Sequence, residues 1–253
     1  MIALRLFMSL ALFSSVAFAQ ASAPVFEVAS VRPSQHQVGP DYNNQLTYST
    51  AGFTARNITL QRLSAEAYQL QLKQVTGPPW IDQNEYDIEA RAASPATREQ
   101  MAIMLRSLVA TRFNLKQHNE TREMRVYELV TDKSGPKIHP IDSSETATPA
   151  AGFHFRGDLR QLADLLAIQL SIPASNNPAE PARASTSPIP VIDKTGLAGT
   201  FDFSVDIHPE LGTDMFATWQ RALQDQLGLK IESRKEGLPV MVIDETSRIP
   251  TEN

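Results

Sequence analysis

The sequence predicts an α+β protein built from two similar halves, each ordered strand, helix, strand, strand, helix, strand, strand. Two observations lead to this prediction. Residues 113–116 align with residues 227–230, and residues 52–56 align with residues 152–156, so that apolar positions recur along the chain. Single helical patterns also separate runs of two strand patterns, which favours largely antiparallel sheets with the helices on one face.

The first half contains an extra N-terminal strand, followed by the first copy of this order. Apolar and polar patterning predicts its first four strands at residues 26–31, 53–56, 72–75 and 86–90. Thr59 and Thr97 are the expected N-caps of two helices, because apolar residues follow each of them at helical spacing. Residues 113–118 and 126–130 are expected to form a hairpin around the charged residues 119–123.

The second half repeats the order. Strands are expected at residues 153–156, 191–192 and 200–207. Apolar spacing predicts one helix that begins near Asp158 and another that contains Trp219. The last two strands, residues 229–232 and 240–243, are expected to form a second hairpin. The tail from Pro250 is expected to fray.

Polar and proline-rich segments divide the mature chain. We expect a first half at residues 20–139, a linker at residues 140–151 and a second half at residues 152–253. Residues 34–51 are predicted to be a loop, and residues 173–190 a flexible one, because too few apolar residues are present to offset the cost of ordering. The halves are expected to share one core, since the first strand has no counterpart, although two separate small domains are an alternative.

The N-terminus has the pattern of an export signal. Arg5 precedes the largely apolar residues 6–18, and an A-x-A cleavage motif ends at Ala19. The apolar run is shorter than the ~20 residues that span a bilayer. We therefore expect residues 1–19 to be removed, with Gln20 as the mature N-terminus, which predicts a periplasmic or extracellular protein with no membrane span.

The composition of the chain excludes several classes of function. The absence of cysteine excludes disulfides, thiol catalysis and thiolate metal sites. A net charge of −5 without a basic cluster argues against nucleic acid as a partner. The 5 histidines lie far apart without metal-binding spacing, and the sequence has neither a glycine-rich phosphate loop nor a nucleophile elbow. No metal and no cofactor is therefore expected.

Three polar patterns could carry chemistry. Residues 193–196 resemble the phosphorylated motif of cation pumps, but their context favours a turn in which Asp193 bonds the local backbone. His118 lies beside acidic residues, at the expected tip of a hairpin, which favours a solvated turn. Asp87 and Asp202 hold matching places in the two halves. They could share a site if the halves meet across a pseudo-twofold axis, or each could be an outward acid that follows an inward aromatic residue.

Aromatic residues add a candidate binding surface. Trp219 shares helical spacing with Leu223, which favours the core, whereas Trp80 follows a glycine and two prolines and could contact a ligand. We place the predicted binding surface in the groove between the halves. Its candidate residues are Trp80, Tyr86, Asp87, His118, Phe201 and Asp202.

Several blocks of sequence resemble a known family in their order. These blocks are residues 26–34, 77–80, 86–90, 104–138, 191–199, 201–203, 223–230 and 242–253. Together they are similar to the large soil-associated family of exported bacterial proteins of unknown function. The resemblance implies bacterial export, and it implies no established activity, cofactor or catalytic residue. In some relatives the module is joined to a membrane zinc peptidase of the antibiotic-sensor type, which implies a sensing or binding role in the envelope.

These observations favour a non-enzymatic exported module that binds a small ligand or a protein of the cell envelope. The missing catalytic set is the main reason for this hypothesis. The alternative is a hydrolase that acts on an envelope or extracellular polymer through Asp87 and Asp202, with His118. A purely structural domain is a third hypothesis.

Overall fold

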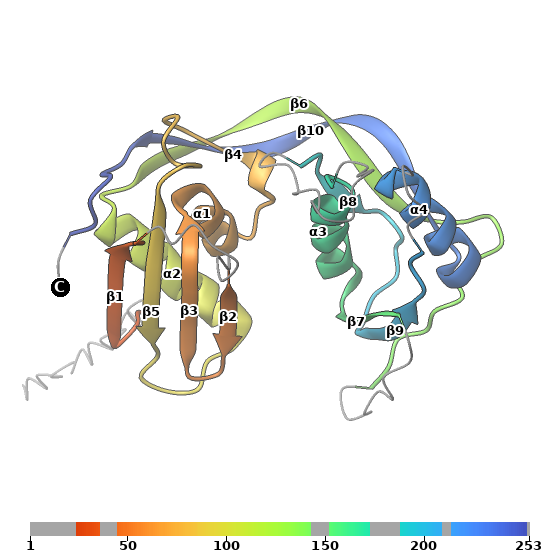
Figure 1. Ribbon diagram of the computed structural model, residues 1–253, viewed down its shortest axis with the longest axis horizontal. Coiled ribbons are helices and arrows are strands. Elements are labelled where there is room, and N and C mark those ends of the chain that lie inside the picture. The colour runs from red at the N-terminus through yellow and green to blue at the C-terminus, as the bar shows by residue number, and fades with distance from the viewer. Residues whose placement is uncertain (1–23, 36–44, 143–151, 173–187, 209–213, 252–253) are drawn as a thin grey trace, which may run out of the picture.

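Two long antiparallel strands run along one side of the molecule and connect its two lobes. They are β6 (Lys116–Thr131) and β10 (Leu229–Glu245), and we call the pair the ribbon. Both lobes lie on the same side of the ribbon (Figure 1). The computed structural model describes residues 24–35, 45–142, 152–172, 188–208 and 214–251. Mixed helices and largely antiparallel sheets confirm the α+β class.

The two expected hairpins are wrong, because each is one continuous strand. Residues 119–123, taken for a turn, lie inside β6, where Glu123 is opposite Gly237 of β10. The charged side chains there do not indicate a turn. They reflect a stretch of ribbon between the lobes, where the side chains on both faces are largely exposed to solvent.

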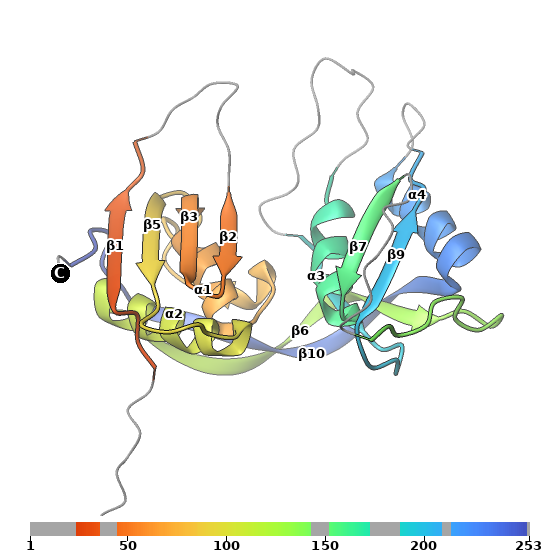
Figure 2. The same cartoon turned by 90° about the horizontal axis from the view of Figure 1, so that it is seen from below.

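The first lobe is a four-stranded antiparallel sheet, with two helices between the sheet and the ribbon (Figure 2). The sheet order is β1-β5-β3-β2. Its elements are β1 (Val28–Pro33), β2 (Leu46–Ser49), β3 (Gly52–Thr59), α1 (Leu60–Tyr68), η1 (Leu72–Gln74), β4 (Val75–Thr76), β5 (Glu85–Arg91) and α2 (Arg98–Arg112). Thr59 and Thr97 cap the helices as predicted, since their side chains accept hydrogen bonds from the backbone of Arg62 and Gln100.

Two local predictions for the first lobe need correction. The expected loop at residues 34–51 contains β2, whose half-buried Leu46 and Tyr48 alternate with exposed Thr47 and Ser49. Four residues are too few for this alternation to stand out in a polar segment. The strand expected at residues 72–75 begins instead as the short helix η1.

The second lobe is smaller. It contains β7 (Phe153–Gly157), α3 (Leu159–Gln169), β8 (Val191–Asp193), β9 (Phe201–Val205), α4 (Met215–Ala222) and the π-helical turn η2 (Leu223–Leu227). β7 and β9 form a two-stranded antiparallel sheet. From β3 and from β7 onward, the element order strand, helix, strand, strand, helix, strand is the same. Similarity of the two halves beyond this order stays a prediction.

The core of each lobe is completed by the C-terminal end of a long strand from the other half of the chain, β10 for the first lobe and β6 for the second. Met241 and Ile243 of β10 belong to the buried cluster of the first lobe, and Leu129 of β6 belongs to that of the second. The short strands follow the same exchange, because β4 pairs in parallel with β10 and β8 pairs in parallel with β6. The core is therefore divided into two main clusters, and each contains residues from both halves of the chain.

The C-terminal segment is ordered against the first lobe. Pro250 is buried, and the backbone N–H of Thr251 donates to the carbonyl of Arg112 at 2.8 Å, so the expected fraying is wrong for these two residues, while residues 252–253 lie outside the described residues. The predicted cleavage site after Ala19, linker residues 143–151 and loop residues 173–187 lie outside the described residues. Within the described ranges, none of the helices has the length and apolar character that crossing a membrane requires.

Candidate functional site

A cleft between the two lobes is the candidate functional site. Its volume is about 570 Å³, within the range of roughly 300–1,000 Å³ that is typical of ligand pockets. The first wall is formed by α1, the segment around η1, Tyr48 of β2 and the N-terminal turn of α2. The second wall is formed by β7 and α3. Both lobes therefore contribute to one concave surface.

The first wall holds a fixed group of polar side chains. The Tyr48 hydroxyl donates to Oε2 of Glu66 at 3.1 Å, and Nη2 of Arg98 lies 3.5 Å from the same oxygen. The Arg98 guanidinium also lies 4.0 Å from the centroid of the Tyr48 ring. Burial and the Glu66 carboxylate raise the pKa of Tyr48, so this hydroxyl remains a donor at neutral pH.

The second wall presents His154 and Arg156, which share one carboxylate. Nε2 of His154 lies 2.7 Å from Oδ1 of Asp202, and Nη1 of Arg156 lies 3.4 Å from Oδ2. The side chain of Asp202 is only 8% exposed, whereas those of His154 and Arg156 are 36% and 38% exposed. Asp202 thus orients two side chains that reach the cleft, without itself lining it.

Hydrogen bonds between the lobes cross the cleft. The Gln71 amide accepts from the backbone N–H of Val191 at 2.9 Å, and it donates to the Val191 carbonyl at 2.5 Å and to Oδ1 of Asp164 at 2.9 Å. Nη2 of Arg160 donates to the carbonyl of Gln69 at 2.5 Å. Burial between the lobes raises the pKa of Asp164, against the opposing effects of Arg160 and Gln71. These contacts hold the two walls in a defined arrangement.

Three of the predicted binding residues are core residues. Tyr86 and Phe201 are each 1% exposed, in the first and second core respectively. The Tyr86 hydroxyl donates to the carbonyl of Arg248 at 2.7 Å, and the Arg248 guanidinium lies 5.5 Å from the centroid of the largely buried Trp80 ring. Trp80 and Tyr86 therefore contact the C-terminal segment, and the cleft lining includes none of the three.

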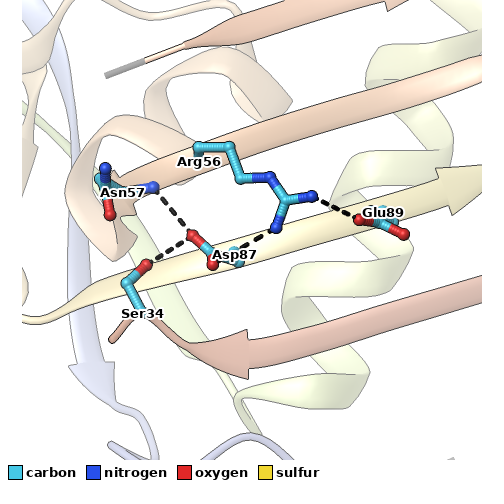
Figure 3. Close-up of polar contacts among 5 residues, drawn as sticks. All are labelled: Ser34, Arg56, Asn57, Asp87 and Glu89. Carbon is cyan, nitrogen blue, oxygen red and sulfur yellow. Dashed lines mark hydrogen bonds and ion pairs between the residues drawn. The ribbon is translucent and has the colours of Figure 1, made fainter. Parts of the chain in front are cut away.

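Asp87 is the centre of a structural cluster in the first lobe (Figure 3). Its Oδ1 accepts from the Ser34 hydroxyl at 2.7 Å and from the backbone N–H of Asn57 at 3.1 Å, while Nη1 of Arg56 lies 3.5 Å from Oδ2. Arg56 also pairs with Glu89 at 2.7 Å. Partial burial raises the pKa of Asp87, but the hydrogen bonds and the Arg56 charge outweigh it and lower the pKa.

The structure separates the acid and base residues that the sequence grouped together. His118 lies on the ribbon, where Nδ1 is 2.9 Å from Oδ1 of Asp244. Asp87 is on β5 of the first lobe and Asp202 is on β9 of the second, at a distance across the molecule (Figure 1). The three side chains have different partners, and none of them lines the cleft.

Sequence reasoning missed His154 and Arg156 as site residues, although a signal was present. The alignment of residues 52–56 with residues 152–156 sets Arg156 against Arg56. Each of these arginines pairs across strands with the aspartate that the alignment also matches. Pairing residues 153–157 antiparallel with residues 201–205 would therefore have indicated the contact between Arg156 and Asp202. His154 lies two residues before Arg156, on the same face of the strand.

The pump-like motif is a turn, as the sequence favours. Oδ1 of Asp193 accepts from the Thr195 backbone N–H at 2.9 Å and from its hydroxyl at 2.7 Å. Gly196 follows with a φ of 72°, which glycine adopts without strain. These bonds occupy the Asp193 carboxylate in local structure.

Comparisons with known proteins identify a family whose function is unknown. No curated protein and no solved structure matches this chain. A family model described as a protein of unknown function, DUF3738, matches residues 61–246. The matched residues include all of α1 except Leu60, as well as β7 and α3, and therefore most of both cleft walls. Since the match covers more than half of the 253 residues, the chain belongs to the DUF3738 family.

Proposed function

We propose that this protein is an exported, non-enzymatic module that binds its ligand in the cleft between the lobes. The observation that supports this proposal is a ligand-sized concavity with polar groups fixed on both walls. Arg98 is held by Tyr48 and Glu66 on one side, and Arg156 is held by Asp202 on the other. Side chains that are oriented before binding lose little entropy when a ligand arrives.

The cleft also combines polar and apolar surface in the way that binding sites do. Leu70 and Leu72 on the first wall and Leu165 and Ile168 on the second wall supply apolar contact area. The charged side chains around them would fix the orientation of a ligand. Apolar contact with a few placed polar groups is the usual composition of a small-ligand or peptide site.

A pair of matched tryptophan variants tests the location of the site. Ile168 and Ile103 are exposed to nearly the same extent, 37% and 38%, on helices, but only Ile168 lines the cleft. We would screen the chain lacking residues 1–19 by thermal shift against peptides, sugars and small anions. Ile168→Trp should abolish the stabilisation by true ligands, whereas Ile103→Trp should preserve it. Ligands that stabilise both variants equally would place the site elsewhere.

Export rests on the N-terminal pattern and has its own test. The protein should be recovered from the periplasmic or extracellular fraction with Gln20 as its first residue. An Ala19→Leu variant removes the small residue at the cleavage motif and should retain residues 1–19. Native protein that begins at Met1 would contradict cleavage.

Hydrolysis of an envelope or extracellular polymer is a second candidate function, and one observation favours it. The Asp202 carboxylate holds the His154 imidazole at 2.7 Å on the wall of the cleft, an arrangement that suits a general base. Release of soluble products from such a polymer should then be lost in His154→Gln and kept in His139→Gln, since His139 is an exposed residue outside the cleft lining. Equal activity in both variants would exclude this role for His154.

A further inference from the structure

The middle of the ribbon, between the two lobes, carries no buried side chain. Five facing pairs of residues, from Thr121–Pro239 to Arg125–Lys235, are exposed or half-buried throughout. Elsewhere β4 and β8 each add a third strand to the ribbon, but neither of them reaches these pairs. An isolated pair of strands is only marginally stable in water, so this stretch can bend without disturbing either core.

Gly237 lies at the centre of this stretch, opposite Glu123. Its φ lies outside the left-handed region, so no turn requires glycine at this position. A Cβ here would lie 3.2 Å from Cγ2 of Thr121, an exposed side chain that can rotate away. Glycine has no side chain to pack and loses much conformational entropy in a strand, so it weakens the ribbon at its middle.

Each lobe holds the ribbon up to the Gly237–Glu123 pair and not beyond it. On the side of the first lobe, the Gln74 amide donates to the carbonyl of Pro239 at 2.9 Å. On the side of the second lobe, Nζ of Lys194 lies 2.8 Å from Oε1 of Glu236. Among the described residues, none of the side-chain bonds between a lobe and the ribbon crosses this pair. The contacts therefore divide the ribbon at Gly237.

Away from the ribbon, the lobes are joined by polar contacts that we call the clasp. The clasp consists of the hydrogen bonds from Gln71 to Val191 and Asp164, together with the bond from Arg160 to the carbonyl of Gln69. The two buried clusters share no residue, so these bonds can break without opening either core. Because water replaces such partners, each hydrogen bond contributes only modestly to the closed arrangement.

We propose that the ribbon is a hinge centred on Gly237, about which the lobes open and close the cleft as the clasp breaks and re-forms. Both lobes lie on the same side of the ribbon, so bending at its middle changes the distance between the cleft walls (Figure 1). The clasp is formed in the structure, which is therefore the closed arrangement. Closure of two lobes about a hinge is a common way to enclose a ligand. This inference rests on the proposed binding function for its purpose, access to the cleft, whereas the motion itself needs no ligand.

Distances between spin labels test the opening. The chain has no cysteine, so Ile103→Cys on α2 and Ala217→Cys on α4 would place one label on each lobe at exposed positions. Double electron–electron resonance on the chain lacking residues 1–19 should give one dominant distance. Adding Gln71→Ala and Arg160→Ala removes the clasp and should raise the population of other distances roughly tenfold. Small-angle X-ray scattering should show a larger radius of gyration, and no change in either measurement would overturn the hinge.

Matched variants of β10 test the position of the hinge. Gly237→Val adds a β-branched side chain that favours the extended strand, and it should narrow the distances of the chain without the clasp. Ser233→Val is the control, because Ser233 is exposed on the same strand but lies where β8 also pairs with β6. Equal distance distributions in the two variants would overturn Gly237 as the centre of the hinge.

Tryptophan fluorescence separates opening from unfolding. Trp80 and Trp219 lie in the first and second cores, so opening at the ribbon should leave their emission unchanged. Broader distances together with shifted emission would mean that a lobe unfolds, which would overturn the hinge. Rigid lobes in a protein whose ligand is lost in Ile168→Trp would overturn the hinge and leave the cleft function standing. Moving lobes without such a ligand would support the hinge and contradict the cleft function.

Discussion

Each lobe pairs an aspartate on one strand with an arginine on the next, but the two aspartates have different surroundings. In the first lobe, the register shifts between Ala55 and Ile58, so Arg56 and Asn57 form a bulge opposite Asp87. Asn57 has a φ of 51° and turns its N–H onto the carboxylate. The bulge thus adds a backbone donor and makes Asp87 part of the scaffold.

The second lobe has no such bulge, and its aspartate supports the cleft instead. Arg156 lies directly opposite Asp202 in a regular ladder, and Asp158 caps the following helix two residues later. In the first lobe the cap, Thr59, follows Arg56 by three residues. The extra residue before the helix of the first lobe thus accompanies a backbone contact to its carboxylate, whereas the carboxylate of the second lobe holds His154, where the first lobe has Thr54, on the cleft wall.

The largest expected effect on stability comes from the C-terminal ends of β6 and β10, which complete the cores described above. Ile243→Ala should destabilise the first lobe by about 2–5 kcal/mol, because it leaves a cavity in a core that the end of the chain completes. The chain has 2 tryptophans, Trp80 in the first core and Trp219 in the second, so single-tryptophan variants report each lobe in urea unfolding.

The control for this prediction is Ile249→Ala, since Ile249 is 78% exposed and should be neutral. Leu129→Ala should produce the reciprocal loss, seen by Trp219. An Ile243→Ala variant that changes only the Trp219 signal would contradict the exchange of strands between the lobes.

A smaller effect is expected at the Asp87 cluster. Asp87→Asn should cost about 1.5–3 kcal/mol at neutral pH, the usual contribution of hydrogen bonds to a charged group. The folded protein lowers the pKa of Asp87 below its ordinary value of 3.8. The carboxylate therefore stabilises the fold above that value, and this contribution is lost as the pH falls through the lower, folded-state pKa. Unfolding of Asp87→Asn should depend less on pH in this acidic range than unfolding of the wild type.

Asp82→Asn is a suitable comparison for Asp87→Asn, because Asp82 is an exposed aspartate of the same lobe. It should leave the free energy of unfolding at neutral pH unchanged. If the free energy of unfolding changed with pH in the same way for Asp87→Asn and the wild type, the Asp87 carboxylate would not be the source of this pH dependence.

The smallest expected effect concerns the contact between the lobes. Gln71→Ala removes the amide that joins Val191 and Asp164, at a cost of about 0.5–1.5 kcal/mol. The transitions seen by Trp80 and Trp219 should separate further in urea, because the lobes are then coupled mainly through the ribbon. Gln83→Ala, in an exposed turn of the first lobe, is the control. An unchanged separation between the two transitions would show that the ribbon alone couples the lobes.

Local signals in the sequence predicted the helices well. The threonines at 59 and 97 and Asp158 cap helices in the structure, and the apolar positions after them are buried. The long strands could not be predicted in this way, because charged residues at positions 119–123 have the same composition in a turn and in an exposed ribbon. Pairing with β10, far along the chain, decides between the two.

The candidate site was predicted only in part. The matched aspartates were recognised as special positions, and Asp202 does support the cleft wall. Tyr86 and Phe201 are core side chains in the structure, and an aromatic residue beside an acid has the same pattern whether it meets a ligand or the core. The cleft itself requires β7 to face α1 across the lobes, which no local pattern encodes.

The exchange of strands also determines when the protein can fold. Val75 pairs with Met241, which lies 166 residues later in the chain, so the first lobe lacks this strand until β10 has emerged. Contacts of such large sequence separation form slowly, and the incomplete core stays exposed in the meantime. A chain that emerges N-terminus first can therefore complete neither core before β10 has been made, because this one strand contributes to both of them.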